Sequence, residues 1–598
     1  MTTKRTPHYI RKPTWNTRLN HCVYLDAEAN RVFPEPNMEV QTLRLGCALH
    51  KRRNTAGVWT KGEWCDFTTC DQLADFLEAK AYKGVTLKVF AHNFDYDVRI
   101  CGLLKTLPER GWELRKSVFG NGPFILMFHR GTSKIRLLCT MNHFKQSLAD
   151  LGETVGYPKL TMPGYDEPDE VWWPYCRRDV EVLATVVELY EDRLNALGMG
   201  PMKATAAQQA LHGFNKRYMA HKMFCHCEPN ALNLAKQSLY GGRTEAFYLG
   251  KSKQPGYKVD YNSHYPSVMR DMLAPIHLAD WRQDPKAAHV EMALAHGPVI
   301  AHCEIDTPEP VYPSHDGQRL LFQTGRFPTY LADAEFRDAW RAGRVSAVYS
   351  LAAYVGAPIF TQFVDDLYGM RQEAKRRGDK VDVALLKLLL NSLFGKYGQK
   401  GYHSEVVGKA RPDEVWVQHL YDVKGAGLGT RRALGGVVTT SWEEGFAFDS
   451  MPEISACITA LGRMKMANDY RVMGWKDLIY SDTDSHIVTP EGYSRLGCPG
   501  QSDCLGALAL EEGPCHYEIR GLKDYTFGER TRTKGVRGDA VELVPGTYRH
   551  EFWQRLSGSL QNGTLDSVVI HHGWKEMKRD YKKGHRLPDG TIVPFRRA

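Results

Sequence analysis

The sequence predicts a multidomain protein that combines α/β and α+β units. The chain has 598 residues, more than one hydrophobic core usually organises. Several short apolar runs read as strands that end in acidic residues, whereas the regions after residue 174 and between residues 364 and 396 have the period of long helices. Hydrophobic residues make up 43% and charged residues 25% of the chain, which is the balance of an ordinary soluble protein.

Charge and hydropathy narrow the class further. The formal net charge is +9, and Lys and Arg gather near both ends, so each end is a candidate for contact with phosphates. No apolar run is long enough to cross a bilayer, and residues 1–20 are basic and polar without the apolar core of a signal peptide. We therefore expect a cytoplasmic protein that does not contact a membrane.

Two acidic groups follow predicted strands in the first 100 residues. Asp26 and Glu28 come directly after the apolar residues 23–25, and their spacing of two places both carboxylates on one face of a strand. The apolar run 89–91 leads into Asn93 and Asp97, with Asp95 as an alternative acid between them. Asn93 is suited to orient either a carboxylate or a substrate.

A further acid lies on a predicted helix that opens at Pro174. Proline is favoured in the first turn of a helix, and Tyr175 and Asp179 share one side of it because they are four residues apart. A site for two metal ions that hydrolyses phosphodiesters needs several carboxylates. The candidates for such a site are Asp26, Glu28, Asp97 and Asp179.

These segments resemble the three exonuclease motifs of family B DNA polymerases of the DEDDy kind. The matches are Asp26-x-Glu28, Asn93-x-x-x-Asp97 and Tyr175-x-x-x-Asp179. The resemblance implies an RNase H-like 3′-5′ exonuclease domain at residues 1–200. In it the four acids would bind two metal ions, Tyr175 would orient the attacking water and Asn93 would contact DNA. The spacing from Asn93 favours Asp97 over Asp95, and Lys159 matches a lysine motif of the protein-primed members.

A second acidic site is indicated by two segments far apart in the chain. Residues 477–488 read as a strand, a tight acidic turn with Asp482 and Asp484, and a second strand. Two anions so close repel each other, so the pair should bind a divalent metal ion or have raised pKa values. Asp260 ends another predicted strand, and Pro266 closes the turn after it.

The helical region between Val364 and Lys396 carries cations at helical spacing. Arg371 and Lys375 are one turn apart, and so are Lys387 and Asn391. Several cations along one helix face can bind a triphosphate, whose charge a single side chain cannot neutralise.

These segments are similar to motifs A, B and C of family B DNA polymerases. Motif A matches Asp260-x-x-Ser263-His264-Tyr265-Pro266, with His264 where the family has Leu; motif B matches Lys387-x-x-x-Asn391-Ser392-x-Phe394-Gly395, with Phe394 in place of Tyr; and motif C matches Tyr480-x-Asp482-Thr483-Asp484. The resemblance implies that Asp260 and Asp484 hold two Mg²⁺ (or Mn²⁺) ions about 3.5–4 Å apart. Asp482 would support the site without bridging both ions.

The same resemblance assigns contacts with nucleotide and DNA. Tyr265 would pack beneath the sugar of the incoming dNTP and exclude a 2′-hydroxyl. Lys387, with Arg371 and Lys375, would bind the triphosphate, and Asn391 and Phe394 would line the nascent base pair. DNA contacts are implied for Tyr240, Gly241, Gly242 and Arg243, where Leu239 stands at the family's Tyr position, and for Lys523, Tyr525 and Lys534.

The resemblance covers nearly the whole chain, and total size and motif spacing look like the compact, protein-primed, phi29-like branch rather than the larger replicative polymerases. It implies a right-hand polymerase domain at 201–598, with a palm at 201–270 and 450–525, fingers at about 361–400 and a thumb at about 526–598. Insertions would occupy about 271–360 and about 401–450. The expected partners are a DNA primer-template, dNTPs and a terminal protein that primes synthesis. Strand displacement and a phage or linear mobile element as the source belong to the same expectation, as do a monomeric state and, if the protein is viral, a location in the host cell cytoplasm.

Three alternatives remain open from the sequence. One is a catalytically silent nucleic-acid-binding protein that keeps a polymerase fold, and another is a family B polymerase that is DNA-primed or needs no primer. The third is a reverse transcriptase, although the Asp-Thr-Asp turn and the linked exonuclease motifs point away from it.

Overall fold

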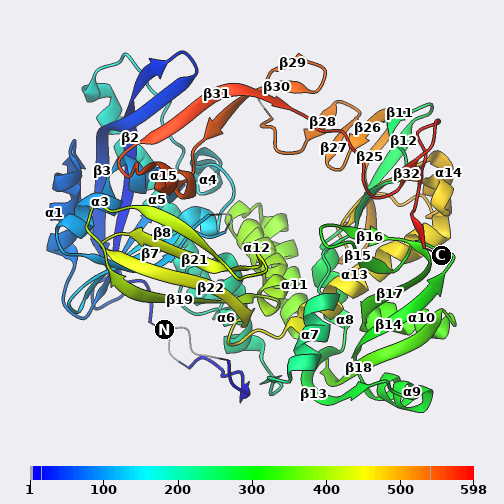
Figure 1. Ribbon diagram of the computed structural model, residues 1–598. Helices are drawn as coiled ribbons and strands as arrows, with labels where there is room; N and C mark the ends of the chain where they lie inside the picture. Colours follow the sequence, from blue (N-terminus) through cyan, green and yellow to red (C-terminus); the bar gives the residue numbers. More distant parts are fainter. Residues whose placement is uncertain (1–4, 15–16, 121, 539, 598) are drawn as a thin grey trace.

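The computed structural model describes residues 5–14, 17–120, 122–538 and 540–597. The elements surround a central opening (Figure 1). A first sheet, which contains β2 and β3, lies on one side of it, and a second sheet, which contains β12 and β25, lies on the other. Strands from the C-terminal part of the chain lie between them. No helix in these ranges is long and apolar enough to cross a membrane.

The first sheet contains strands from both ends of the chain. Its order is β29-β30-β31-β3-β2-β5-β8-β7-β6, with β4 paired to β3. The N-terminal strands are β2 (His21–Glu35), β3 (Met38–Arg52), β4 (Glu63–Phe67), β5 (Thr86–Ala91), β6 (Glu113–Val118), β7 (Ile125–Arg130) and β8 (Ser133–Cys139). Strands β2, β5 and β8 are parallel to one another, and helix α5 (Asp169–Ala196) packs on β2 and β3.

Helix α5 begins earlier than the sequence analysis expects. The predicted start is Pro174, but the first residue of the helix is Asp169, after Pro168 at the N-cap. Asp169 and Glu170 occupy the first turn, where negative charge is favourable. Pro174 therefore lies inside the helix, where its missing N–H removes a single backbone hydrogen bond close to the N-terminus.

The C-terminal strands extend the first sheet instead of forming a sheet of their own. Strand β31 (Val568–Glu576) pairs with β3, from Met38 opposite His571 to Gln41 opposite Val568. The next strands are β30 (Thr547–Trp553) and β29 (Glu542–Val544). Leu560 and Ile570 share a buried cluster with the N-terminal strands. In Figure 1 the red β31 accordingly lies beside the blue β2–β3 hairpin.

The second sheet is antiparallel and carries the predicted acidic turn. Its order is β10 (Thr244–Ala246), β23 (Leu478–Asp482), β24 (Ser485–Val488), β12 (Gly256–Tyr261) and β25 (Leu508–Cys515). This confirms the strand-turn-strand prediction for 477–488. Helices α13 (Pro452–Met473) and α8 (His264–Asp271) pack together beside it. A smaller sheet contains β11 (Gly250–Lys251), β26 (Tyr517–Gly521), β27 (Asp524–Phe527) and β28 (Arg530–Thr533).

The two predicted insertion intervals each contain a sheet. The first has β13 (Ala274–Gln283), β18 (Val345–Ala357), β14 (Val299–Thr307) and β17 (Thr324–Ala332), joined in parallel by the C-terminal β34 (Arg596–Arg597). It also contains β15 (Pro313–His315), β16 (Leu320–Phe322), α9 (Ala287–His296) and α10 (Asp333–Arg341). The second has β19 (Lys400–Lys409), β22 (Val437–Phe446), β21 (Gly427–Leu434) and β20 (Trp416–Tyr421).

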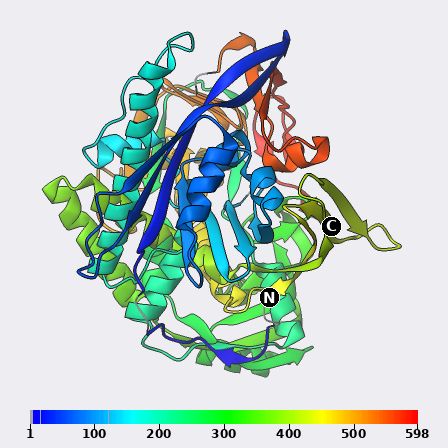
Figure 2. The same cartoon turned by 90° about the vertical axis from the view of Figure 1, so that its left-hand side faces the viewer.

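The second insertion sheet lies against the first sheet, as Figure 2 shows for the olive strands beside the blue and cyan ones. The backbone N–H of Leu114 in β6 donates to Gly435 O at 3.0 Å. Arg432 also donates to the Ser117 hydroxyl. The glycine-rich segment 424–436 therefore includes strand β21 and a turn that contacts another sheet.

Between the two insertions stand two helices, α11 (Thr361–Arg377) and α12 (Lys380–Tyr397). Gly378, with φ 72°, ends α11, so the predicted continuous helix is divided in two. The remaining helices are α1 (Cys70–Lys80), α2 (Phe94–Ile100), α3 (Leu103–Glu109), α4 (Leu148–Thr154), α6 (Ala206–Gly213), α7 (Pro229–Ser238), α14 (Pro490–Arg495) and α15 (Leu556–Asn562). Short strands are β1 (His8–Tyr9), β9 (Phe224–Cys225), β32 (His585–Arg586) and β33 (Ile592–Val593).

Candidate active sites

The second sheet brings Asp260 and Asp484 to one edge of a cavity. Asp260 lies opposite Ser485 in the pairing of β12 with β24, and the backbone N–H of Tyr261 donates to Asp484 O at 2.9 Å. The cavity has a volume of about 690 Å³. The acidic residues that line it are Asp260, Asp482, Asp484, Asp503 and Glu511.

The charges of this acidic cluster are not fully neutralised. Burial, followed by the negative charges of Asp484 and Glu511, raises the pKa of Asp260 to about 7, against the opposing effect of Lys258 and Lys387. The pKa of Asp484 is also raised, by burial and then by Asp482. Carboxylate oxygens are the ligands that Mg²⁺ prefers, and a bound cation would remove the repulsion that these pKa values report. The residues therefore fit a divalent metal site.

Asp482 is occupied by other partners. Lys523 Nζ lies 2.6 Å from both of its carboxylate oxygens, and the Thr244 hydroxyl donates to Asp482 Oδ1 at 2.9 Å. Its charge is thus matched by a lysine, unlike that of Asp260 or Asp484. This geometry suits the supporting role expected for Asp482.

The predicted nucleotide residues lie on α8, α11 and α12. The rings of Tyr265 and Phe394 are packed with their centroids 4.4 Å apart. Lys387 and Asn391 are exposed one turn apart on α12. The positive charge of Lys387 opposes the rise in the pKa of Asp260. Arg371 and Lys375 lie on α11 and contact residues beside the cavity, as described below.

The 240–243 segment packs against the acidic turn that contains Asp482, Thr483 and Asp484. A Cβ on Gly242 would lie 2.7 Å from Thr483 Cγ2 and 3.0 Å from the Tyr265 hydroxyl, so only glycine fits there without displacement. The backbone N–H of Thr483 donates to Arg243 O at 2.7 Å. Arg463 donates to Tyr240 O at 2.9 Å and to Gly241 O at 2.8 Å.

The expected contact of Arg243 with DNA is not available in this structure. The side chain is only 2% exposed, and its guanidinium pairs with Glu245 and donates to Pro310 O at 2.7 Å. It also stacks on Phe322, with 4.0 Å between Cζ and the ring centroid. Sequence reasoning could not anticipate this because residues 310 and 322 lie far along the chain.

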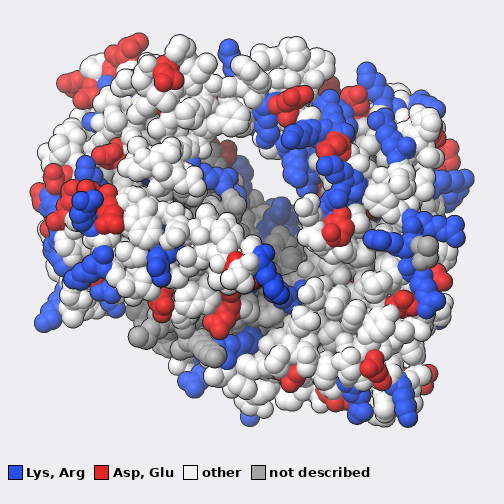
Figure 3. All heavy atoms as spheres, in the orientation of Figure 1, with Lys and Arg blue, Asp and Glu red and all other residues white. Residues whose placement is uncertain are grey.

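The other predicted DNA residues differ in exposure. Tyr525 is buried and packs on Tyr480, with ring centroids 5.2 Å apart, so its ring offers little surface to a primer. Tyr240 is also buried. Lys523 is held by Asp482, whereas Lys534, after β28, is exposed. Figure 3 shows Lys and Arg gathered beside the central opening. The exposed cations in and after β28 are Arg530, Arg532, Lys534 and Arg537.

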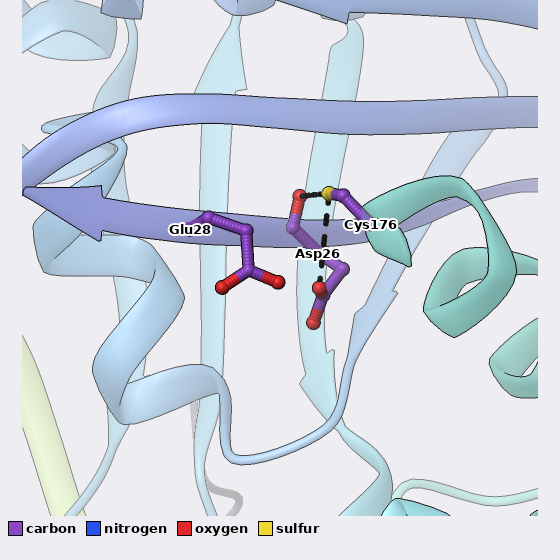
Figure 4. A group of neighbouring side chains, drawn as sticks. All are labelled: Asp26, Glu28 and Cys176. Atoms are coloured by element: carbon purple, nitrogen blue, oxygen red, sulfur yellow. Dashed lines mark hydrogen bonds between the residues drawn. The ribbon is translucent and has the colours of Figure 1, made fainter. Parts of the chain in front are cut away.

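A second acidic site lies in the N-terminal unit. Asp26 and Glu28 lie on one face of β2, as predicted, and Figure 4 shows their carboxylates on the same side of the strand. Asp97 comes from α2 and Asp179 from α5. Burial, followed by the charges of Asp179, Glu28 and Asp97, raises the pKa of Asp26 well above its usual value. The four acids are therefore brought together.

The remaining members of this site show the same excess of negative charge. Burial and then Asp179 raise the pKa of Glu28 to about 7. Burial raises the pKa of Asp179 to about 6, although Lys159 opposes the shift. Lys159 Nζ forms an ion pair with Asp179 Oδ2 and lies 5.0 Å from the centroid of the Tyr175 ring. Asp179 Oδ1 is buried without a hydrogen-bond partner in the described part of the chain, so this donor set also fits divalent metal.

The structure separates the two candidates for the second motif. Asp97 is 2% exposed. Burial raises its pKa well above the usual value, and the charge of Glu28 adds to this shift, while the backbone N–H groups of Asp97 itself and of Ala27, which lies between Asp26 and Glu28, oppose it. Asp95 instead accepts a hydrogen bond from Leu556 N at 3.3 Å and lies 3.6 Å from Arg99 Nε. Asp97 therefore faces the acids, and Asp95 faces the C-terminal segment. Asn93 precedes α2 with φ 64°.

Sequence reasoning missed one member of this site, Cys176. Its Sγ donates to Asp26 O at 3.5 Å and to Asp26 Oδ2 at 3.8 Å (Figure 4). Ligand atoms of Asp26, Glu28 and Cys176 lie within 4.8 Å of one another. The sequence feature that could have pointed to Cys176 is its position directly after Tyr175, on the apolar side of the predicted helix.

The chain thus holds two acidic clusters, one around Asp26 in the first sheet and one around Asp260 and Asp484 in the second sheet. A family model for DNA polymerase type B, organellar and viral, matches residues 165–421. The match covers less than half of the chain.

Individual relatives are more distant. A DNA polymerase of Kluyveromyces lactis is 23% identical over 256 residues, which are 37% of this chain and 23% of that protein. A DNA-directed DNA polymerase of Enterobacteria phage PRD1 is 22% identical over 315 residues, 51% of this chain and 52% of that protein. The chain thus spans about half or less of these curated relatives.

A solved structure matches over a much larger share. Phi29 DNA polymerase complexed with primer-template DNA and incoming nucleotide has a TM-score of 0.65 and 14% sequence identity, and the match covers 94% of this chain and 100% of that one. An orthorhombic crystal form of phi29 DNA polymerase gives a TM-score of 0.58. At this identity the likeness concerns the fold, which is that of a multidomain exonuclease and palm, fingers and thumb polymerase.

Proposed function

We propose that the protein is a DNA-templated DNA polymerase that extends a primer 3′ end with dNTPs. The observation that carries this proposal is the meeting of Asp260 and Asp484 in one cavity, with the positive charge of Lys387 near enough to oppose the rise in the pKa of Asp260. Two bound Mg²⁺ or Mn²⁺ ions would activate the primer hydroxyl and stabilise the leaving pyrophosphate. Asp260 and Asp484 would hold these ions.

The surrounding residues position the nucleotide. Lys387, Arg371 and Lys375 bind the triphosphate, whose several negative charges need more than one cation. The packed rings of Tyr265 and Phe394 form a floor for the sugar and the nascent base pair. A rigid ring below the sugar leaves no room for a 2′-hydroxyl, which discriminates against ribonucleotides by steric exclusion.

Primer extension on a primed single-stranded DNA with Mg²⁺ tests this function. Asp484→Asn should abolish extension, because it removes a charge that the ions require. Asp75→Asn is the matched control, since Asp75 is an exposed acid on α1 paired with Arg110. Extension by Asp484→Asn at the rate of the control would refute the site. Comparison of DNA and RNA templates separates this activity from reverse transcription.

We further propose a proofreading 3′-5′ exonuclease at the second site. Asp26, Glu28, Asp97 and Asp179 would hold two divalent ions there, Tyr175 would orient the attacking water, and Lys159 holds Asp179 in place. Asp97→Ala should abolish the degradation of a mismatched 3′ end, whereas Asp95→Ala should keep it because Asp95 faces Leu556. Equal loss in both variants, or persistent degradation after Asp26→Ala and Glu28→Ala, would contradict these ligands.

The wider biological role is also a proposal. The similarity to phi29 DNA polymerase supports a palm at 201–270 and 450–525, fingers at 361–400, a thumb at 526–598 and insertions at 271–360 and 401–450. We infer that the basic rim of the central opening contacts DNA, that a terminal protein primes synthesis, and that the enzyme displaces strands while replicating a phage or linear mobile-element genome. Incubation with dNTPs and the product of the neighbouring gene should give a covalent protein–nucleotide adduct. Products longer than one circle on a primed circular template would indicate strand displacement.

A further inference from the structure

A loop beside the polymerase cavity is anchored next to Asp260. This loop, residues 497–507, connects α14 to β25. Asn262 N donates to Ala507 O at 3.0 Å, and Gly506 N donates to Asn262 O at 2.8 Å. The Asn262 amide also donates to Ser502 O. Three bonds therefore fix the loop to a residue only two positions after Asp260.

The same loop is held by one face of α11. The Tyr368 hydroxyl donates to Asp503 O at 2.6 Å and Gln372 Nε2 donates to the same oxygen at 2.7 Å. Lys375 Nζ donates to Asp503 Oδ1 at 2.6 Å. Tyr368, Gln372 and Lys375 follow the spacing of one helix face, so three successive contacts join α11 to a single loop residue.

Arg371, the other α11 residue assigned to the triphosphate, contacts the residue that precedes α8. Arg371 Nη1 donates to the Ser263 hydroxyl at 3.2 Å. Both cations that the proposed function assigns to the triphosphate on α11 thus have partners beside the cavity. Of these two partners, only Asp503 is an anion, and Asp503 lines the same cavity as Asp260 and Asp484.

We propose that the Asp503 carboxylate stands in for a phosphate of the incoming nucleotide and forms a latch between the 497–507 loop and α11. The latch holds Lys375 until a triphosphate displaces the carboxylate, so Asp503 sets the apparent affinity for dNTP. This proposal rests on the proposed polymerase function. A carboxylate suits the part because, like a phosphate oxygen, it only accepts hydrogen bonds from an ammonium group.

Exposure makes the exchange feasible. The Asp503 side chain is 74% exposed and that of Lys375 is 35% exposed, so solvent screens the pair and its separation is inexpensive. Displacement of such a pair should weaken nucleotide binding by a factor of about two to five. The bonds from Tyr368 and Gln372 reach the backbone carbonyl of Asp503 and do not depend on its carboxylate.

One substitution can therefore change the carboxylate of Asp503 without changing the backbone carbonyl that anchors the loop. Asp503→Asn removes the charge and retains the carbonyl that Tyr368 and Gln372 bind, so the loop keeps its attachment. Asp75→Asn makes the same change of charge on α1 and serves as the matched control. Lys375→Ala and the double variant Asp503→Asn with Lys375→Ala complete a double-mutant cycle.

Calorimetric titration with inorganic tripolyphosphate tests the latch without requiring catalysis. Asp503→Asn should bind tripolyphosphate about two to five times more tightly than the unchanged chain, and Asp75→Asn should not. In the Lys375→Ala background the substitution at 503 should have no effect. Equal or weaker binding by Asp503→Asn, or the same gain without Lys375, would overturn the proposal.

Steady-state incorporation provides the second measurement. Asp503→Asn should lower the KM for dNTP by a similar factor and leave kcat within about twofold, because the latch is already open when chemistry occurs. A raised KM would mean that Asp503 positions Lys375 for the nucleotide and would also overturn the latch. Failure of the unchanged chain to incorporate any dNTP would refute the proposed function, and the tripolyphosphate titration would still decide the latch.

Discussion

Gly242 offers the sharpest test of how the acidic turn is positioned. A Cβ at this position would lie 2.7 Å from Thr483 Cγ2, and contacts shorter than 3.0 Å require something to move. Restoring an ordinary contact of 3.4 Å displaces the turn by about 0.7 Å, and Asp484 follows Thr483 directly. Forcing an extra methyl group into such packing costs about 1–3 kcal/mol. Misplacing a catalytic group by about 1 Å can cost about 100-fold in rate.

Gly242→Ala should therefore lower kcat for single-nucleotide incorporation by about 10- to 100-fold, measured by rapid quench at saturating dNTP. The additional change Thr483→Ser removes the clashing Cγ2 and should restore a large part of the rate. Gly241→Ala is the matched control for thermal unfolding, because a Cβ there meets no atom within 4 Å. A Gly242→Ala enzyme with unchanged kcat, or one that Thr483→Ser fails to improve, would refute the reasoning.

Three other predictions follow from buried charge. Burial raises the pKa of Glu453 to about 7, so its ionisation destabilises the fold increasingly as the pH rises above the unfolded pKa of 4.5. Glu453→Gln should therefore have the same free energy of unfolding in urea as the unchanged chain near pH 5, and a value about 3 kcal/mol higher at pH 8. An unaltered pH dependence of that free energy would contradict this. Arg243→Met leaves Glu245 buried and unpaired, which should cost about 3–5 kcal/mol, and adding Glu245→Gln should recover part of it; loss of DNA affinity at unchanged stability would reinstate the phosphate role. Mg²⁺ at about 100 times the Kd of the polymerase site should stabilise the protein by about 2.7 kcal/mol through that site. In a chain whose other acidic site is removed by Asp26→Ala and Glu28→Ala, a melting temperature that rises equally with and without Asp260→Asn and Asp484→Asn would place the ion elsewhere.

Local chemistry explains which parts of the fold the sequence could predict. The hairpin of β23 and β24 follows from two apolar strands around a short polar turn, and the structure has it at Leu478–Asp482 and Ser485–Val488. Asp26 and Glu28 share a strand face because their spacing of two matches the strand period. These predictions need only neighbouring residues.

Long-range pairing explains the rest. Nothing in residues 38–41 or 568–571 alone indicates that Met38 will face His571 and extend one sheet with both ends of the chain. The burial of Arg243 is set by Phe322 and Pro310, which a motif centred on Tyr240 to Arg243 does not contain. Motif resemblance locates residues near a site, whereas exposure depends on distant segments that cover them.

Helix α2 contacts both the acidic cluster of the first sheet and the C-terminal segment at residues 554–559. Asp97 faces the acidic cluster, while Arg99 donates to Gln554 O at 2.7 Å and to the Ser559 hydroxyl at 3.2 Å. Asp95 accepts from Leu556 N at the start of α15, which has no cap from its own N-cap side chain. The C-terminal segment is therefore braced by the same helix that carries Asp97. A displacement of residues 554–559 would act on α2 through Asp95 and Arg99.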